Sequence, residues 1–215
     1  MARAKAADHE EKRGAILRTA AAAFAEHGYD ATSMRDLATA CGVSKALIYH
    51  YYPSKEVLLS DVIGEHLEAL LTAIGEVPYD LEPTARLRAA TATILENYQE
   101  ADSEHKLQLN ALSRLPVEDQ KRLRQLQRQI VEKMEKVIIA LAPERFEAEP
   151  TLLRPVTMSL FGMLNWFYLW KRGGGISRED YANMVADLFI GGLDNAIEGQ
   201  TVSAHPAGLT ESVRQ

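Results

Sequence analysis

The chain contains a single cysteine, Cys41, among its 215 residues, so it cannot form an internal disulfide. This fits a protein of the reducing cytosol. A secretory signal is not predicted, because the first residues, Met-Ala-Arg-Ala-Lys, are polar. The apolar run from Leu160 to Trp170 is too short to span a bilayer and contains Asn165. We therefore expect a soluble cytoplasmic protein with no membrane partner.

Residue patterns typical of enzymes and of metal sites are also missing from the sequence. We find no nucleophile motif, no glycine-rich phosphate loop, and neither the HExxH nor the paired-cysteine spacing. The six histidines are far apart, at positions 9, 27, 50, 66, 105 and 205. The sequence therefore predicts a protein that is not an enzyme and that holds neither a metal nor a cofactor.

Positive charge is scarce overall, and the formal net charge of −6 by itself argues against a nucleic-acid binder. Its distribution changes this interpretation, because residues 1–55 hold eight Lys/Arg and six Asp/Glu, a balance of +2. The remaining residues therefore carry −8. A basic head on an acidic body allows the head to meet DNA while the body is repelled.

Strand signals are nearly absent, whereas helical periodicity and capping residues recur along the chain, so we predict an all-α fold. The first helix is predicted from about Glu10 to His27. The second opens at Ser33, which forms a capping box with Asp36. The third starts at Ser44, and the fourth runs from Lys55 to about Ile74. Five more helices are predicted near residues 84–100, 103–114, 117–141, 150–171 and 178–198.

The segment from Ser44 to Tyr51 has the character of a DNA-recognition helix. It follows a helix-sized segment and the turn signal Cys41-Gly-Val43, and it ends before Pro53. Two short helices joined by such a turn form a helix-turn-helix, whose second helix enters the major groove. Many other all-α proteins also contain a glycine between two helices, so the turn alone leaves both interpretations open.

A longer pattern surrounds this turn. It reads Phe24-x3-Gly28-Tyr29-x2-Thr32-Ser33-Met34-Arg35-x-Leu37-Ala38-x3-Gly42-Val43-Ser44-Lys45-x3-Tyr49-x-Tyr51-Tyr52-Pro53-Ser54-Lys55-Glu56-x-Leu58. Over about residues 10–60, it resembles the DNA-binding domain of the TetR/AcrR family of transcriptional regulators. The resemblance implies an N-terminal three-helix head with a helix-turn-helix, a C-terminal helical body for ligand binding and dimerisation, and a homodimer.

Resemblance and side-chain chemistry together predict the phosphate contacts of the head. Thr32 or Ser33, at a helix N-terminus, should bind a phosphate with its hydroxyl and backbone N–H. Tyr49 and Tyr51 match positions that donate hydroxyls to phosphates, and Lys55 matches a phosphate clamp. We expect Ile48 and Tyr52 to belong to the core instead.

Base contacts are predicted from the exposed first turn of the recognition helix, Ser44, Lys45, Ala46 and Leu47. Lys45 can donate to guanine, while Ala46 and Leu47 can touch thymine methyl groups. For His50, a phosphate contact and a merely exposed position remain equal alternatives. The predicted DNA-binding residues are Thr32, Ser33, Ser44, Lys45, Ala46, Leu47, Tyr49, His50, Tyr51 and Lys55.

The segment from Met158 to Trp170 is apolar on nearly every side, so we expect it to be buried against its own subunit and against a partner. Asn165 is the polar exception and needs hydrogen-bond partners if it is buried. The aromatic residues fit a core or a dimer interface as well as a ligand site. The candidate ligand contacts are Met158, Phe161, Gly162, Asn165, Trp166 and Trp170. The basic residues Lys121, Arg122, Arg124 and Arg128 are interpreted chiefly as a solvated face.

The last predicted helix, from Asp180 to Ile197, carries a stripe suited to helix pairing. Each glycine inside a helix costs about 1 kcal/mol relative to alanine, which the close approach of another helix would offset. The predicted dimer-interface residues are Met184, Leu188, Gly191, Gly192 and Asn195. A two-fold dimer places two recognition helices in successive major grooves and therefore predicts a palindromic operator.

The run Phe-Gly-Met-Leu-Asn-Trp, followed by Tyr-Leu-Trp, is similar to TetR/AcrR members that sense acyl-CoA or other CoA thioesters. This similarity implies a repressor that an acyl-CoA or aryl-CoA thioester releases from double-stranded operator DNA. A multidrug-responsive repressor and a DNA-binding factor without a small-molecule effector remain alternatives.

The predicted domains and segments of the chain are a disordered basic arm at 1–9, the helix-turn-helix domain at 10–54, the ligand-binding and dimerisation domain at 55–199 and a disordered tail at 200–215.

Overall fold

The computed structural model describes residues 2–99, 101–171 and 175–198, and the side chains of residues 9–193 within these ranges. All regular elements in these ranges are helical, which confirms the predicted all-α fold. The helices are α1 (Ala2–His27), α2 (Met34–Ala40), α3 (Lys45–Tyr51), α4 (Lys55–Glu76), α5 (Pro83–Asn97), α6 (Asp102–Asn110), α7 (Val117–Ile139), α8 (Pro143–Ala148), α9 (Leu153–Asn165), α10 (Phe167–Trp170) and α11 (Arg178–Glu198), with short 3₁₀ turns η1 (Leu112–Arg114) and η2 (Pro150–Leu152).

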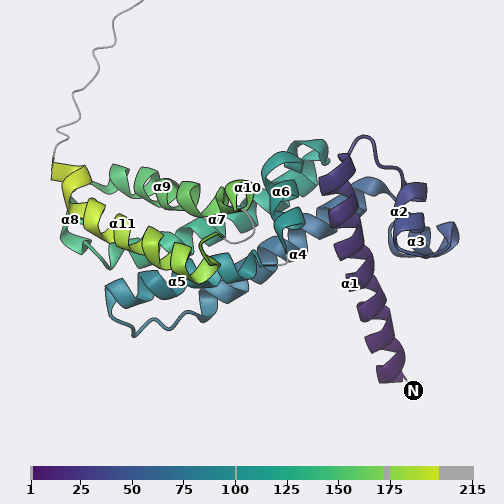
Figure 1. Cartoon of the computed structure of the whole chain (residues 1–215), viewed down its shortest axis with the longest axis horizontal. Coiled ribbons are helices and arrows are strands. Elements are labelled where there is room, and N and C mark those ends of the chain that lie inside the picture. Colours follow the sequence, from purple (N-terminus) through teal and green to yellow (C-terminus); the bar gives the residue numbers. More distant parts are fainter. Residues whose placement is uncertain (1, 100, 172–174, 199–215) are drawn as a thin grey trace, which may run out of the picture.

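The helices form an elongated molecule with a small head and a larger body. Helices α1 to α3 make the head at one end, and α5 to α11 make most of the body (Figure 1). The long helix α4 runs from the head into the body, and its buried side chains include Leu58, Leu59, Ile63 and Leu67. Movement of α4 would therefore change the position of the head relative to the body.

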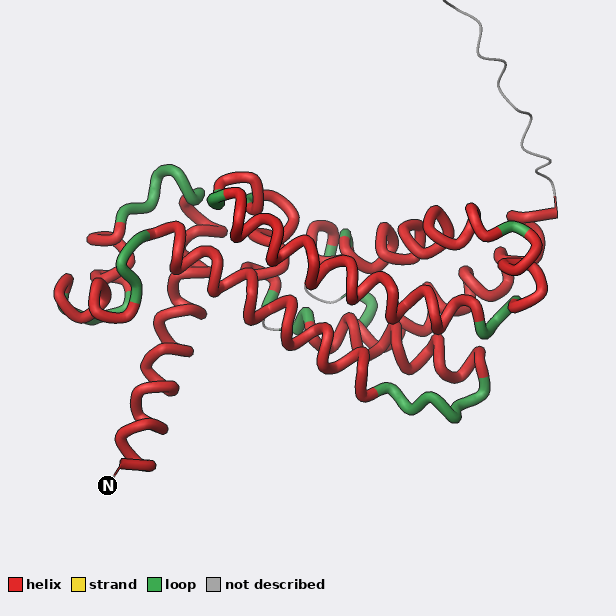
Figure 2. The backbone as a smooth tube through the Cα atoms, turned by 180° about the vertical axis from the view of Figure 1, so that it is seen from behind, coloured by secondary structure: helices red, strands yellow, loops and turns green. Residues whose placement is uncertain are grey.

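Helix α1 starts earlier than predicted. It begins at Ala2, whereas the sequence predicted a disordered arm over residues 1–9, and its first turns project away from the body (Figure 2). The reason is composition, since residues 2–7 consist of Ala, Arg and Lys, which favour a helix, and no Gly or Pro separates them from the amphipathic part. Farther along α1, Ile16, Leu17, Ala20 and Phe24 are buried as predicted. The predicted tail at 200–215 lies outside the described residues.

Two glycines end helices of the head in the left-handed backbone conformation. Gly28 has φ 88° after α1, and Gly42 has φ 65° after α2. Residues with a side chain rarely adopt this conformation, so the two glycines let the chain reverse tightly. The predicted capping box is also confirmed, because Ser33 Oγ accepts a hydrogen bond from Asp36 N at 3.2 Å while Ser33 N donates to Asp36 Oδ2 at 2.9 Å.

The predicted helix at 150–171 is interrupted. Helix α9 ends at Asn165, Trp166 has φ −93° and ψ −3°, and the single turn α10 follows. The segment from Met158 to Trp170 is apolar on nearly every side, so its periodicity gave no sign of a break, and Asn165 at the end of α9 forms the tertiary contacts described below. The sequence also missed α8, a six-residue helix that starts at Pro143. Helices α9 and α11 pack together and run antiparallel along the body (Figure 1).

Candidate nucleic-acid interface and effector cavity

Helix α3 is anchored on one side and free on the other. Ile48 is fully buried, and Tyr52, just after the helix, is 2% exposed, so both belong to the core as predicted. Ser44, Lys45, Ala46, Leu47, Tyr49 and His50 are all exposed. The Lys45 ammonium lies 5.8 Å from the centroid of the Tyr49 ring. The outer face of α3 therefore offers a cation, hydroxyls and an imidazole to a partner.

The two tyrosines predicted to contact phosphates differ in their surroundings. Tyr49 is 42% exposed, whereas Tyr51 is less exposed, because its ring lies between two other rings. The Tyr51 ring centroid lies 4.7 Å from that of His9 on α1 and 5.7 Å from that of His50. The helical start of α1 thus packs against the end of α3, a contact that a disordered arm would not make.

Thr32 is only 4% exposed, and its hydroxyl donates to the Gly28 carbonyl at 2.8 Å. The structure therefore uses the Thr32 hydroxyl to hold the turn before α2 rather than presenting it to solvent. The neighbouring Ser33 is exposed, but its hydroxyl donates to Asp36 Oδ2 at 2.6 Å. These bonds hold the pKa of the Asp36 carboxyl below its usual value. Backbone N–H groups at the N-terminus of α2, rather than these hydroxyls, are therefore the donors that we expect a phosphate to meet.

Lys55 is bound inside the head. Its ammonium donates to the carbonyls of Tyr29 at 2.8 Å and Thr32 at 3.1 Å, and it lies 4.2 Å from the centroid of the Tyr29 ring. Burial and the nearby Glu56 carboxylate raise the pKa of Tyr29 to about 12, so its hydroxyl stays protonated and donates to Glu56. Lys55 thus fixes the loop between α1 and α2, in addition to its predicted role at a phosphate.

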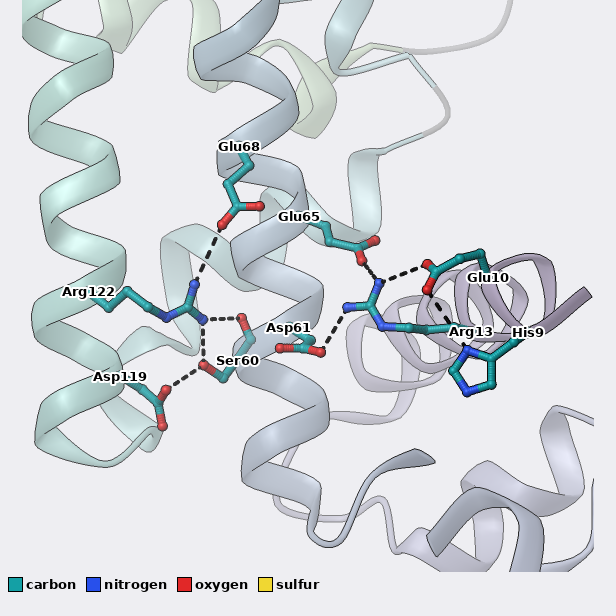
Figure 3. Close-up of polar contacts among 9 residues, drawn as sticks. All are labelled: His9, Glu10, Arg13, Ser60, Asp61, Glu65, Glu68, Asp119 and Arg122. Carbon is teal, nitrogen blue, oxygen red and sulfur yellow. Dashed lines mark hydrogen bonds and ion pairs between the residues drawn. The ribbon is translucent and has the colours of Figure 1, made fainter. Parts of the chain in front are cut away.

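Helix α4 is bound by polar contacts on two sides (Figure 3). Toward the head, Arg13 of α1 pairs with Asp61 at 2.9 Å and with Glu65. Toward the body, Arg122 of α7 donates to Ser60 Oγ at 3.0 Å and pairs with Glu68 at 3.7 Å. The same α4 helix therefore connects α1 of the head with α7 of the body.

A cavity of about 370 Å³ lies in the body between α4, α5, α6, α7 and α9. Its volume falls in the range of small-molecule sites. Three predicted ligand residues, Met158, Phe161 and Asn165, line it from one face of α9. Leu70, Ile130 and Tyr98 complete much of its buried wall.

The other predicted ligand residues, Gly162, Trp166 and Trp170, are not among the residues that line this cavity. All three are exposed, with Trp166 at 57% and Trp170 at 47%. The end of α9 at Asn165 accounts for the two tryptophans, because the helix break turns the following residues away from the cavity face, whereas Gly162 lies within α9 on an exposed side of the helix. The structure therefore places these tryptophans on the outer surface of the body.

Asn165 is half-buried and has hydrogen-bond partners on both its side chain and its backbone. Its side-chain oxygen accepts from the Tyr98 hydroxyl at 2.9 Å, and its backbone carbonyl accepts from His105 Nε2 at 3.1 Å. Behind this group, the His105 ring stacks on Tyr98 with centroids 4.0 Å apart and meets His66 of α4 at 5.7 Å. Burial, and then the neighbouring His105, lower the pKa of His66 to about 3, so both rings stay neutral near pH 7. The cavity wall is thus directly connected to α4.

The predicted dimer residues lie on an uncovered side of α11. Met184 is 41% exposed and Leu188 is 61% exposed, and a Cβ added to Gly191 or Gly192 would meet no atom within 4 Å. Leu169 and Trp170 of α10 are exposed, as is Trp166 between α9 and α10. The backbone of Asn195 lies in α11, but its side chain is outside the described residues.

Three arginines of the cavity rim were missed as ligand residues. Arg124 and Arg128 of α7 and Arg154 of α9 line the cavity, although Arg124 and Arg128 were interpreted as part of a solvated face. Their spacing of four residues placed them on one side of α7. The sequence gave no sign that α9 would bring a third arginine to the same side.

Two family descriptions match the chain. Residues 16–62 match "Bacterial regulatory proteins, tetR family", and residues 80–193 match "Tetracyclin repressor-like, C-terminal domain". The crystal structure of a TetR-family transcriptional regulator from Bordetella parapertussis 12822 is similar over 85% of this chain and 96% of that one, with 36% identity and a TM-score of 0.78. AibR in complex with isovaleryl coenzyme A and operator DNA is similar over 84% of this chain and 96% of that one, with 25% identity and a TM-score of 0.67.

Among curated proteins, the HTH-type transcriptional repressor KstR2 of Rhodococcus jostii (strain RHA1) is 34% identical over 95 residues, which are 44% of this chain and 45% of that protein. The chain matches less than half of the length of the curated relatives.

Within the described residues, no helix is both long enough and apolar enough to cross a membrane. The same part of the chain holds no group of three or more side chains suited to a metal ion.

Proposed function

Because this chain belongs to the TetR family of bacterial transcriptional regulators, we propose that it is a DNA-binding repressor that acts as a homodimer. It binds a palindromic operator through α3 of each subunit. It leaves the operator when a small molecule, an acyl-CoA or aryl-CoA thioester, enters the cavity of the body.

The free face of α3 is the observation that carries this proposal. Ile48 anchors the helix in the head while Lys45, Tyr49 and His50 remain exposed. No acidic residue occurs between Leu37 and Lys55, so negative charge on this segment does not oppose the approach of a phosphate backbone. A short helix with one buried face and one polar face suits insertion into the major groove.

The effector class is supported by the cavity and by one relative. The structure of AibR contains isovaleryl coenzyme A together with operator DNA, and that protein is 25% identical to this chain. The cavity here has a buried apolar wall that includes Leu70, Ile130 and Phe161, which suits an acyl or aryl group. We transfer only the class of compound, not isovaleryl coenzyme A itself.

Helix α4 supplies a route from the cavity to the DNA. An effector that displaces α7 acts on α4 through Arg122, and α4 acts on α1 through Arg13 (Figure 3). The two contacts thus connect α7 to α1 through one helix. In a dimer, the resulting rotation of each head changes the distance between the two α3 helices and lowers operator affinity.

The proposal is tested by selecting duplexes from random DNA with the full-length protein, and then adding acyl-CoA and aryl-CoA thioesters of increasing size. We expect a palindrome whose half-site centres lie about 34–36 Å apart, bound with a dissociation constant of about 10⁻⁸ M or tighter. At least one thioester should release the complex in a fluorescence-anisotropy titration. Failure to enrich any sequence at low ionic strength would contradict DNA binding, and an operator that no small molecule releases would contradict the effector.

A further inference from the structure

The rim of the body cavity carries an unusual concentration of positive charge. Arg124 and Arg128 of α7 and Arg154 of α9 all line the cavity and are exposed. No Asp or Glu occurs among the described residues that line it. This cationic rim contrasts with the rest of the body, since the residues after 55 carry a formal charge of −8.

The arginines are only partly neutralised by their neighbours. Arg154 Nη1 pairs with Glu135 Oε1 at 3.2 Å, and Arg124 Nη2 donates to the neutral amide of Gln120 at 2.9 Å. Arg128 has no hydrogen bond or ion pair to the described part of the protein. Three guanidinium groups thus share one carboxylate, which leaves most of their donors open to a ligand.

Much of the inner wall of the same cavity is apolar. Leu70 is 1% exposed, Ile130 is 4% exposed and Phe161 is 6% exposed. On α9, Arg154, Met158 and Phe161 follow one another at intervals of four and three residues, so they line one face of the helix. The site therefore has two chemically different parts, with hydrocarbon inside and cations at the entrance.

We propose that Arg124, Arg128 and Arg154 form an anion-binding rim, and that the effector is an amphiphilic anion. Its apolar group occupies the buried wall, and its phosphate or carboxylate binds the arginines. Guanidinium groups suit this task because their donors bind both kinds of oxyanion in a bidentate manner. This inference rests on the proposed ligand-responsive function and deepens it, because it assigns the anionic group of the effector to named residues and gives the effector a direction in the cavity. A lipophilic cation does not fit this arrangement.

The test measures direct binding to the full-length protein by calorimetry, with octanoyl-CoA, octanoate, CoA and decyltrimethylammonium as ligands. We expect octanoyl-CoA or octanoate to bind and the cation not to bind. Arg128→Gln should weaken binding of the anion about 10-fold, which corresponds to the loss of one charge-assisted contact. Arg124→Gln and Arg154→Gln should act in the same direction, and raised salt should weaken the wild-type protein more than Arg128→Gln.

The matched control is Lys121→Gln, which removes one positive charge from an exposed position of α7 that does not line the cavity. This variant should bind the anion with an affinity within about twofold of the wild-type value, since solvent screens an exposed charge that lies at a distance from the ligand. Preference for octanoate over octanoyl-CoA would assign the rim to a carboxylate, and the reverse preference would assign it to the phosphates of CoA. Either result supports the anion-binding rim.

Binding of decyltrimethylammonium alone would overturn the rim assignment and leave a ligand-responsive regulator of another class. Binding of an anion with equal affinity by Lys121→Gln and all three arginine variants would also overturn it. If none of the four compounds binds, the anionic effector is rejected. Operator selection, which needs no ligand, then decides separately whether the DNA-binding function stands.

Discussion

Lys45 is the cation of α3 best placed to contact base edges. It is exposed in the first turn of the helix, and no acidic residue follows Asp36 before Glu56 in the sequence. We expect Lys45→Ala to lower operator affinity by about 1–3 kcal/mol and to lower affinity for random DNA by less, because a base contact carries sequence information. Fluorescence anisotropy with the operator and with a scrambled duplex measures both values.

Tyr49→Phe provides the comparison for this prediction. Removing a phosphate contact should weaken binding to the operator and to random DNA equally, because every sequence has the same backbone. Lys136→Ala is the control, since it removes an exposed cation from α7 in the body and should change neither affinity. An equal loss on both duplexes for Lys45→Ala would assign Lys45 to the backbone rather than to the bases.

Other predicted contacts show what a residue pattern leaves open. The motif predicted Thr32 and Lys55 as phosphate contacts, but it did not show that the Thr32 hydroxyl and the Lys55 ammonium bond to backbone carbonyls of the loop between α1 and α2. A pattern of residue types gives positions in sequence, whereas hydrogen-bond partners depend on where neighbouring carbonyls lie. The exposure of Leu47 and the burial of Ile48, in contrast, agree with the positions predicted from the resemblance and from side-chain chemistry.

At the scale of elements, the contact between α4 and α6 should make stability depend on pH. His66 of α4 is buried against His105 of α6, and burial lowers the pKa of His66 to about 3. Above pH 6.5 the ring is neutral in both the folded and unfolded states. Below pH 6.5 the unfolded chain binds a proton that the folded chain does not, so the free energy of unfolding falls. At pH 5 this loss should reach about 2 kcal/mol.

Chemical denaturation of the full-length protein between pH 7 and pH 5 measures this effect. His66→Gln should flatten the dependence on pH, even if it lowers stability at pH 7, because the titrating group is gone. His27→Gln removes an exposed imidazole at the end of α1 and serves as the control. A pH profile that is the same for His66→Gln and for the wild type would show that His66 does not cause the loss.

The broken helix α9–α10 also belongs to the scale of elements. The segment from Leu160 to Trp170 is apolar on nearly every side, with Asn165 as the polar exception. Its periodicity therefore predicted one continuous helix. The break at Trp166 coincides with the bonds that Asn165 forms with Tyr98 and His105. These partners come from residues about 60 positions away in the sequence, and local preference could not reveal them.

At the scale of the whole molecule, the exposed apolar side of α11 predicts a dimer. Leu188 is 61% exposed beside the open glycines, and large apolar surfaces of this kind usually bind a partner. We expect Leu188→Glu to convert a dimer into a monomer, because it places two new carboxylates, one from each subunit, in the two-fold interface, where they repel each other and lose their hydration. Light scattering after size-exclusion chromatography measures the mass.

The control is Val117→Glu, which replaces a residue of similar exposure, 63%, at the start of α7. An acidic residue at a helix N-terminus is favourable, so this variant should keep the wild-type mass and operator affinity. Leu188→Glu should lose operator affinity together with its dimeric mass, since each monomer holds only one α3. A Leu188→Glu protein that remains a dimer would place the interface elsewhere.

The sequence by itself determined the all-α fold, through short-range periodicity and caps, and it determined the helix-turn-helix and the exposed face of α3 through the residue pattern that resembles the TetR/AcrR family. Only the tertiary structure decided which residues form the cavity. It brought Arg154 beside Arg124 and Arg128, and it turned Trp166 and Trp170 away from the wall. The physical reason is that a cavity is defined by the crossing of helices from distant parts of the chain, and the order of residues within one helix does not encode those crossings.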